Sequence, residues 1–357
     1  MMADKNSFHK SQLIALDHVV AGHDGVLLDP SGEIVVKPCK QSEIDFYEST
    51  LAHPDFLPHI PTYMGRISLG SDTTVAQAAG TLILPGEIVP DLTPTGPGIA
   101  GATLIENAWV PSNGGKIQTD LAVMLENLVA GYKKPNVLDV KLGARLWADD
   151  APVAKRAQLD KRADETTSKP LGFRIEGMKT YQGVDTNAHN GITADGYRLY
   201  DRMYGRGFNI DTVPEGFGEY FRLVKNDKPE GPIRKVIRRF IDDLKAMAHV
   251  LENEESRMYS TSLLFVYEGD QETLQDAFLT EKDIIASLND SAAETEESSN
   301  GNGTVEVDEE GRIKFPSIQS LKLIDFAHAE WTPGQGPDEN VLYGIRNVIK
   351  ILSGLVG

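Results

Sequence analysis

The sequence predicts an α+β protein organised as two lobes, and three observations lead to this prediction. The chain has 357 residues, which is more than a single hydrophobic core usually holds. Short apolar runs separated by turn residues indicate β-strands, whereas two longer segments keep the helical spacing of apolar residues. Polar residues with chemically useful side chains also stand at the ends of four of the apolar runs.

The N-terminal third predicts a hairpin, a helix and a further strand. The apolar runs 26–28 and 34–37 flank Asp29-Pro30-Ser31-Gly32, a turn signal, so they are expected to pair as a hairpin that ends at Lys37. Residues 41–52 have helical character, and residues 121–125 form a buried strand that runs into Glu126-Asn127-Leu128.

The segment Pro135–Gly143 is the most informative part of the chain. Asp139 and Lys141 stand two residues apart at the end of an apolar run, so in an extended strand they point to the same face. Gly143 then allows the backbone to turn away. A cation and a carboxylate side by side suit the binding of phosphate and sugar hydroxyls, although a surface ion pair remains the alternative from this pattern alone.

A helix is predicted to start at Asp150-Ala151-Pro152, with Asp150 as its cap and Pro152 in its first turn. Lys155, Gln158 and Arg162 follow at i, i+3 and i+7, on one side of that helix. The helix has few large apolar residues, so this side is either ligand-facing or simply solvated.

The C-terminal half predicts two core helices and two strands. Residues 233–251 form an amphipathic helix, and residues 259–267 form a strand. The acidic, Ser/Asn/Gly-rich stretch of about 287–312 is expected to be disordered because it cannot bury enough apolar surface. Residues 321–324 form a strand that ends in Asp325, and a closing helix begins near residue 340.

The net charge of −18 is unevenly distributed. Residues 268–310 carry 14 acids and one base, whereas residues 131–180 carry 11 Lys and Arg against 7 Asp and Glu. A basic region therefore surrounds Lys141 despite the acidic total, and local fields govern ligand capture. Cys39 is the single cysteine, which fits a reducing compartment, cytosol or nucleus. No apolar run reaches the roughly 20 residues that span a bilayer, and no signal-peptide pattern is found at the N-terminus.

The polar residues at strand ends have the layout of a two-lobed kinase: Lys37, Glu126 to Leu128, Asp139 with Lys141, and Asp325. Phosphoryl transfer needs alignment and charge neutralisation more than covalent chemistry, so lysines and a metal-binding carboxylate are the expected parts. The His-Arg-Asp and Asp-Phe-Gly motifs and the Walker A loop are missing. The pattern therefore excludes a protein kinase and a P-loop enzyme.

With these residues in place, the chain resembles the inositol polyphosphate kinase family. Residues 135–143 match its Pro-x-x-x-Asp-x-Lys-x-Gly signature, and residues 323–328 match its Ile-Asp-Phe-(Ala/Ser)-His motif. Residues 259–265 are similar to its Ser-Ser-Leu-Leu motif, with Thr261 in place of a serine. Further similar segments are 21–25, 166–168, 172–174 and 177–179. Within the family, the chain is most similar to the multikinases of the fungal type, and the hexakisphosphate kinases are the runner-up.

The resemblance implies a protein-kinase-like fold with an antiparallel sheet in each lobe and a small helical inositol-binding segment. The N-lobe would cover residues 1–130 and the C-lobe residues 131–357, with the inositol-binding segment at about 144–190. It also implies ATP and Mg²⁺ as cofactors. For the nucleotide, Lys37 would contact the ATP phosphates, the backbone of Glu126 and Leu128 would contact adenine, and Asp139 would contact the ribose. Lys141 would contact both the γ-phosphate and the substrate. Asp325 would bind magnesium, and Ser262 would support the phosphate-metal cluster. Lys155, Gln158, Arg162 and His328 are the candidate inositol-phosphate contacts.

The activity that the resemblance implies is phosphorylation of inositol polyphosphates, from inositol 1,4,5-trisphosphate to tetrakis- and pentakisphosphate. Phosphatidylinositol bisphosphate is a further candidate substrate, and formation of pyrophosphates from inositol hexakisphosphate is the alternative activity. A scaffold role in a transcription complex, with the acidic stretch as the interacting segment, is the rival from another class of function. We expect a monomer in nucleus and cytoplasm that does not bind nucleic acid directly.

Overall fold

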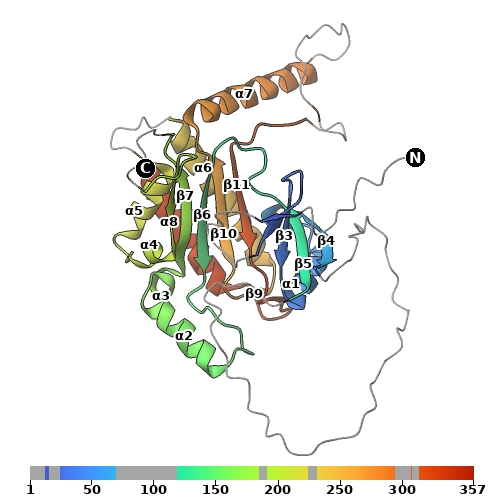
Figure 1. Cartoon of the computed structure of the whole chain (residues 1–357), viewed down its shortest axis with the longest axis vertical. Coiled ribbons are helices and arrows are strands. Elements are labelled where there is room, and N and C mark those ends of the chain that lie inside the picture. The colour runs from blue at the N-terminus through green and yellow to red at the C-terminus, as the bar shows by residue number, and fades with distance from the viewer. Residues whose placement is uncertain are drawn as a thin grey trace, which may run out of the picture.

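The computed structural model describes residues 13–15, 25–69, 119–184, 191–223, 231–293, 307 and 313–357. Two five-stranded antiparallel sheets form the framework (Figure 1). This is the predicted two-lobed α+β architecture. Among the described helices, none combines the length and the apolar content needed to cross a membrane.

The N-lobe sheet has the strand order β1-β2-β3-β5-β4. Its strands are β1 (Ile14–Ala15), β2 (Leu27–Leu28), β3 (Ile34–Pro38), β4 (Tyr63–Ser68) and β5 (Leu121–Glu126). The predicted hairpin is β2–β3, and the carboxylate of Asp29 holds its turn by accepting the backbone N–H groups of Ser31 and Ile34. Helix α1 (Gln41–Ser49) and the 3₁₀ turns η2 (Thr50–Ala52) and η3 (Leu57–His59) connect β3 to β4.

The C-lobe sheet has the order β11-β10-β6-β7-β8. Its strands are β6 (Pro135–Leu142), β7 (Phe173–Tyr181), β8 (Tyr197–Tyr200), β10 (Ser262–Glu268) and β11 (Gln319–Ile324), and a small ribbon pairs β9 (Ser256–Met258) with β12 (Ala329–Trp331). The helices are α2 (Val153–Asp164), α3 (Ser168–Leu171), α4 (Arg202–Arg206), α5 (Val213–Phe221), α6 (Pro232–Asn253), α7 (Gln271–Ala293) and α8 (Glu339–Val356). Helices α6 and α8 pack against the C-lobe strands, with α5 beside α8, while α2 and α3 lie at the lower end of the sheet (Figure 1).

One hydrophobic core runs through both lobes. It joins Ile44, Phe46 and Tyr47 of α1 to the C-lobe strands and to the buried faces of α6 and α8. The predicted apolar stripe of α6 is buried, as its helical spacing requires. The two lobes are therefore packed together over α1 and share their core.

Three local predictions are wrong. The helix α2 begins at Val153 after Pro152, with no side-chain cap, so Asp150 does not cap it. The strand predicted over 259–267 begins only at Ser262, as β10, because the chain turns at Tyr259 and Ser260, where Ser260 adopts a positive φ of 60°. The acidic stretch 287–312 is helical at its start, since α7 continues to Ala293. Extending a helix that has already formed costs little, whereas most of the rest of this stretch lies outside the described residues.

Candidate active site

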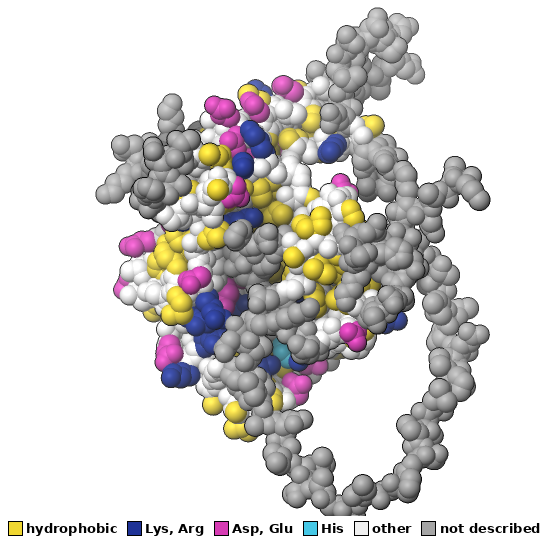
Figure 2. All heavy atoms as spheres, viewed as in Figure 1, with side chains coloured by type: hydrophobic (Ala, Val, Ile, Leu, Met, Phe, Trp, Pro, Cys, Tyr) yellow, Lys and Arg dark blue, Asp and Glu magenta, His cyan; other side chains and the backbone are white. Residues whose placement is uncertain are grey.

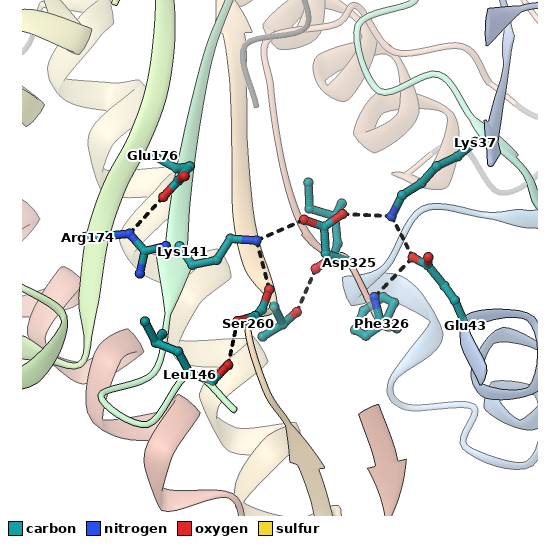
Figure 3. Close-up of polar contacts among 11 residues, drawn as sticks. Lys37, Glu43, Lys141, Leu146, Arg174, Glu176, Ser260, Asp325 and Phe326 are labelled. Atoms are coloured by element: carbon teal, nitrogen blue, oxygen red, sulfur yellow. Dashed lines mark hydrogen bonds and ion pairs between the residues drawn. The ribbon is translucent and has the colours of Figure 1, made fainter. Parts of the chain in front are cut away.

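Asp325 joins the two lobes by accepting from a lysine of each (Figure 3). Its Oδ1 lies 2.8 Å from Nζ of Lys37 on β3, and its Oδ2 lies 3.1 Å from Nζ of Lys141 on β6. The side chains of both lysines are 15% exposed and that of Asp325 is 22% exposed. Two partly sheltered ammonium groups, one from each lobe, thus converge on one carboxylate.

The ionisation of this trio follows from its mutual attraction. Burial alone would raise the pKa of Asp325, but Lys37 and Lys141 outweigh burial and hold that pKa well below its ordinary value. Burial opposes the charged form of both lysines as well, yet the nearby carboxylates raise the pKa of each. All three groups are therefore charged over the whole neutral range.

The backbone around Asp325 turns sharply to present its side chain. Asp325 follows the last residue of β11 and has a φ of 69°, in the left-handed region that aspartate tolerates better than most residues. Thr261 donates its hydroxyl to the carbonyl oxygen of Ile324 at 2.7 Å and so holds the end of the strand. On the other side, Ser260 donates to the carbonyl oxygen of Leu146, and its own carbonyl accepts from Nζ of Lys141 at 2.9 Å. Lys141 is thus fixed from two directions.

Glu43 of α1 is a member of the site that the sequence analysis missed. Its Oε1 lies 2.6 Å from Nζ of Lys37 and also accepts the backbone N–H of Phe326 at 3.2 Å, although the residue is only 2% exposed. A signal was present in the sequence, because Glu43 precedes the buried Phe46 and Tyr47 by three and four residues. An acid on the apolar face of a helix needs a buried partner.

Asp139 lies on the same face of β6 as Lys141, as the sequence predicted, and is almost completely buried at 1% exposure. Burial is the main reason that the pKa of Asp139 is raised to about 7. Its Oδ1 has no hydrogen-bond partner in the described part of the chain, and the same holds for Oγ of Ser262. Ser262 stands opposite Lys141 on β10. Ser262 lies near enough to lower the pKa of Asp139 somewhat, although the two side chains do not form a hydrogen bond.

An apolar surface adjoins these polar groups. Leu128, Val137 and Val266 form a small buried cluster, against which Leu264 and Ile324 also pack. The strand register places Val137 opposite Val266 and Asp139 opposite Leu264, so this surface continues the face that carries Asp139 and Lys141. The partly buried Leu264 and Ile324 at its edge suit contact with a flat, apolar ligand group such as a purine base.

Of the two residues predicted to contact the base, Glu126 donates its backbone N–H to the carbonyl oxygen of Thr62. Within the described residues, the backbone N–H of Leu128 donates no hydrogen bond.

The predicted substrate residues divide into two groups. Lys155 of α2 donates to Nε2 of His328 at 3.2 Å, and burial together with the charges of Lys155 and Lys40 lowers the pKa of His328 to about 4. His328 is therefore neutral at neutral pH and accepts from the lysine. Lys40, just before α1, is a second residue that the sequence analysis missed. Arg162 lies further along α2, where the charges of Arg206, Arg174 and Arg202 act on it. Gln158 forms no hydrogen bond within the described part of the chain.

The site fits a nucleotide-bound divalent metal held mainly by the ligand. Within the described residues, no group of three or more His, Cys, Asp or Glu side chains could form a cage for a metal. Mg²⁺ and similar ions are instead held in nucleotide enzymes by one or two carboxylates and the phosphate oxygens. Asp325 supplies such a carboxylate, and the unpartnered hydroxyl of the buried Ser262 stands on the neighbouring strand. The donor set therefore suits a metal that arrives with a nucleotide.

Comparisons with known proteins agree with this geometry. A family model described as inositol polyphosphate kinase matches residues 122–353. The inositol polyphosphate multikinase of Saccharomyces cerevisiae is 30% identical, over 94% of this chain and 96% of its own. Human inositol hexakisphosphate kinase 1 is 29% identical, over 64% of this chain and 51% of its own. The crystal structure of the inositol phosphate multikinase from S. cerevisiae with ADP and Mn²⁺ has a TM-score of 0.59 and 26% identity, covering 91% of this chain and 100% of that one.

Proposed function

The chain belongs to the inositol polyphosphate kinase family, and from this premise we propose that it transfers the γ-phosphate of ATP to hydroxyls of inositol polyphosphates, starting from inositol 1,4,5-trisphosphate. The observation that carries the proposal is the convergence of Lys37 and Lys141 on Asp325 between the lobes. Transfer of a phosphoryl group needs positive charge aligned with the transferred group, and this arrangement supplies it.

Each site residue has a role that its contacts support. Lys37, oriented by Glu43, would bind the nucleotide phosphates from the N-lobe. Lys141 would neutralise charge that develops on the transferred phosphate and meet the substrate beyond it. Asp139, with an oxygen lacking any partner in the described chain, would accept hydrogen bonds from the ribose hydroxyls. Leu264 and Ile324, at the partly exposed edge of this apolar cluster, would contact the adenine.

We propose Mg²⁺ as the metal that accompanies the nucleotide, since a related structure contains ADP with Mn²⁺. A bound divalent ion would neutralise charge on the phosphates, and Asp325 with Ser262 would hold it. Lys37 and Lys141 contact both oxygens of Asp325, so a metal held by Asp325 would share this carboxylate with the two lysines.

The substrate class follows from the positive charges beyond Lys141. Lys40, Lys155 and, further along α2, Arg162 are cations presented from different elements, and His328 lies among the first two. Such an open set of charges would accept several patterns of ring phosphates, which permits successive phosphorylation. The near-complete coverage of the yeast multikinase favours this activity over pyrophosphate synthesis, because the human hexakisphosphate kinase is matched over only about half its length.

The remaining expectations also stay proposals. A nuclear and cytoplasmic location is supported by Cys39, a buried free thiol. Phosphatidylinositol bisphosphate as a further substrate, a monomeric state and protein partners of the acidic stretch rest on the family resemblance alone.

Product analysis tests the proposal. The protein is incubated with ATP and Mg²⁺ together with inositol trisphosphate, inositol hexakisphosphate or vesicles that contain phosphatidylinositol bisphosphate, and the products are separated by charge. We expect tetrakis- and pentakisphosphate from the trisphosphate. The Lys141→Ala variant should form neither, and Lys161→Ala, an exposed lysine of α2, should behave as the wild type. Pyrophosphate products alone would favour the hexakisphosphate kinase activity, and no product from any substrate would overturn the proposal.

A further inference from the structure

Four arginines gather beside β7, apart from the residues that meet the nucleotide. Arg174 lies on β7, Arg202 and Arg206 on α4, and Arg162 on the last turns of α2. Burial, together with the charges of the other three arginines, lowers the pKa of Arg162, although the charge of Glu176 opposes this shift. Figure 2 shows Lys and Arg side chains concentrated at the lower end of β7, near α3. Like charges close together disfavour one another, so an anion that binds among them is favoured.

Within the described part of the chain, Arg162 and Arg206 receive little compensation from carboxylates. Glu176 of β7 accepts from Nε of Arg174 at 2.8 Å, and Arg174, Lys141 and Arg206 together overcome burial and lower the pKa of Glu176. Asp201 also attracts Arg206, but its Oδ1 caps α4 by accepting the backbone N–H groups of Met203 and Tyr204. In the described part of the chain, neither Arg162 nor Arg206 forms an ion pair with a carboxylate.

Arg206 is the least satisfied member of the group. Its Nε and Nη2 are buried without any hydrogen-bond partner, and its Nη1 has only the sulfur of Met203 at 3.9 Å. Its position is nonetheless fixed, because the preceding Gly205 packs so closely on β7 that a Cβ there would lie 2.0 Å from the carbonyl oxygen of Ile175. A guanidinium held in place with unused donors is prepared to bind an oxyanion.

One member of the group, Arg174, lies next to the transfer site. Arg174 stands directly opposite Lys141 in the pairing of β7 with β6, and neighbouring strands are about 4.8 Å apart. Figure 3 shows Arg174 and Glu176 on the far side of Lys141 from Asp325. A ring substituent two or three carbons from the reacting hydroxyl would extend toward these arginines when that hydroxyl faces Lys141.

We propose that Arg206, together with Arg162, forms a subsite for a ring phosphate of the substrate remote from the hydroxyl that reacts. The proposal rests on the proposed function, because it assumes an inositol polyphosphate in the site. Arg174 is committed to Glu176 and to the hydroxyl of Ser168, so it acts as a positioning residue that anchors the arginine group to β7. A substrate with more phosphates would gain more from this subsite than one with few.

The test is Arg206→Gln, with Arg66→Gln as the matched control, since Arg66 is an exposed arginine on β4. The first readout needs no turnover: the melting temperature of the full chain is measured with and without inositol hexakisphosphate, in the absence of ATP. We expect Arg206→Gln to leave the melting temperature of the free protein unchanged or higher, and to shrink the rise that the ligand causes. A purely structural arginine would instead lower the melting temperature of the free protein and leave the rise caused by the ligand unchanged.

The second readout is kinetic. The Michaelis constant for the inositol phosphate should rise about tenfold to a hundredfold in Arg206→Gln, the range for loss of a sheltered charge-assisted hydrogen bond, while the constant for ATP stays the same. Arg162→Gln, on a partly exposed helix face, should act in the same direction and serves if Arg206→Gln folds poorly. Unchanged ligand-induced stabilisation and unchanged constants in both variants would overturn the subsite. A wild-type protein that binds inositol hexakisphosphate but phosphorylates no inositol phosphate would instead overturn the proposed function alone.

Discussion

At the scale of single residues, the site is a chain of opposite charges that links the lobes. Glu43 contacts Lys37, Lys37 contacts Asp325, and Asp325 contacts Lys141. Removing one member leaves a neighbour with less compensation in a partly buried place, which costs more than a surface ion pair. The effects of substitution should therefore be large at these residues and small at exposed residues of the same type.

Glu43→Gln tests this reasoning in α1. The amide can still accept the N–H of Phe326 but no longer pairs with the charge of Lys37, so we expect a loss of about 1–3 kcal/mol in the free energy of unfolding and a higher Michaelis constant for ATP. Urea denaturation and steady-state kinetics measure the two effects. Glu48→Gln, an exposed acid of the same helix, is the control. Equal behaviour of the two variants would remove Glu43 from the site.

Asp139 predicts a pH dependence of stability. Its pKa is raised from 3.8 to about 7, so between these values the folded protein keeps a proton that the unfolded chain has released. The retained proton stabilises the folded protein. This contribution to the free energy of unfolding is complete below about pH 4 and is lost as the pH rises through about 7. Asp139→Asn cannot titrate, and its free energy of unfolding should therefore fall less between pH 5 and pH 8.

Urea denaturation at several pH values, with the exposed Asp242→Asn as the control, checks this prediction. The same pH slope in Asp139→Asn and in the wild type would contradict it. Burial is the leading cause of the raised pKa of Asp139. A shallower pH slope in Asp139→Asn would also support burial as the property that keeps this carboxylate protonated.

At the scale of elements, helix α2 carries the substrate side of the site. Lys155 near its start meets His328, and Arg162 near its end meets the arginine group. The helix buries only Ala163 among its own residues, as its lack of large apolar residues predicted. Its charged side is therefore available to a ligand.

The double variant Lys155→Gln with Arg162→Gln should raise the Michaelis constant for the inositol phosphate and leave that for ATP nearly unchanged. Each sheltered charge-assisted contact is worth roughly 1.5–3 kcal/mol, or about tenfold to a hundredfold in affinity. Lys161→Gln, whose side chain on the same helix is 73% exposed, is the control and should stay within about 0.5 kcal/mol of the wild type. Equal changes for both substrates would place the inositol site elsewhere.

Elements with a strong local signal were predictable from the sequence. The β2–β3 hairpin has its turn residues, and α6 and α8 have long apolar stripes, so each signal lies within one segment. The break between β9 and β10 has no such signal, because the left-handed Ser260 is stabilised by contacts with Leu146 and Lys141 from distant parts of the chain.

Those residues of the site that have a signal within their own segment were also predictable from the sequence. Lys141 and Asp325 were found through motifs and Lys37 through its place at the end of a predicted strand, and the structure brings the three together. Glu43 and Lys40 stand outside those motifs, and the arginines of α4 come near Arg162 only through the packing of Gly205 on β7. Periodicity and charge counts do not contain such tertiary contacts.

At the scale of the whole molecule, the lobes are joined by an aromatic cluster around α1. The ring of Phe46 stacks on Phe326 and Trp331 at centroid distances of 4.8 and 5.0 Å, and Trp331 donates from its ring nitrogen to Ser49. His53 stacks on Trp331 and contacts Glu254 at 2.7 Å. With a continuous core beneath these contacts, the position of α1, and hence of Glu43, depends on the C-lobe.

A shared core predicts one cooperative unfolding transition for both lobes. Phe46→Ala should lower the free energy of unfolding by about 3–5 kcal/mol, as for other buried aromatic residues, and should still give a single transition. Circular dichroism and tryptophan fluorescence, recorded against urea concentration, should report the same midpoint. Two separate transitions in the wild-type protein would show that the lobes unfold independently.

The most direct test of the central claim concerns Asp325, where the two lobes meet. The rate of transfer of the γ-phosphate of ATP to inositol 1,4,5-trisphosphate is measured for the wild type and for Asp325→Asn across a range of Mg²⁺ and Mn²⁺ concentrations. A neutral amide is a poor ligand for a hard dication, and it pairs weakly with Lys37 and Lys141. We therefore predict that no concentration of either metal restores transfer in Asp325→Asn. The control Asp45→Asn, a change at an exposed residue of α1, should keep the normal rate. Wild-type rates in Asp325→Asn would contradict the account.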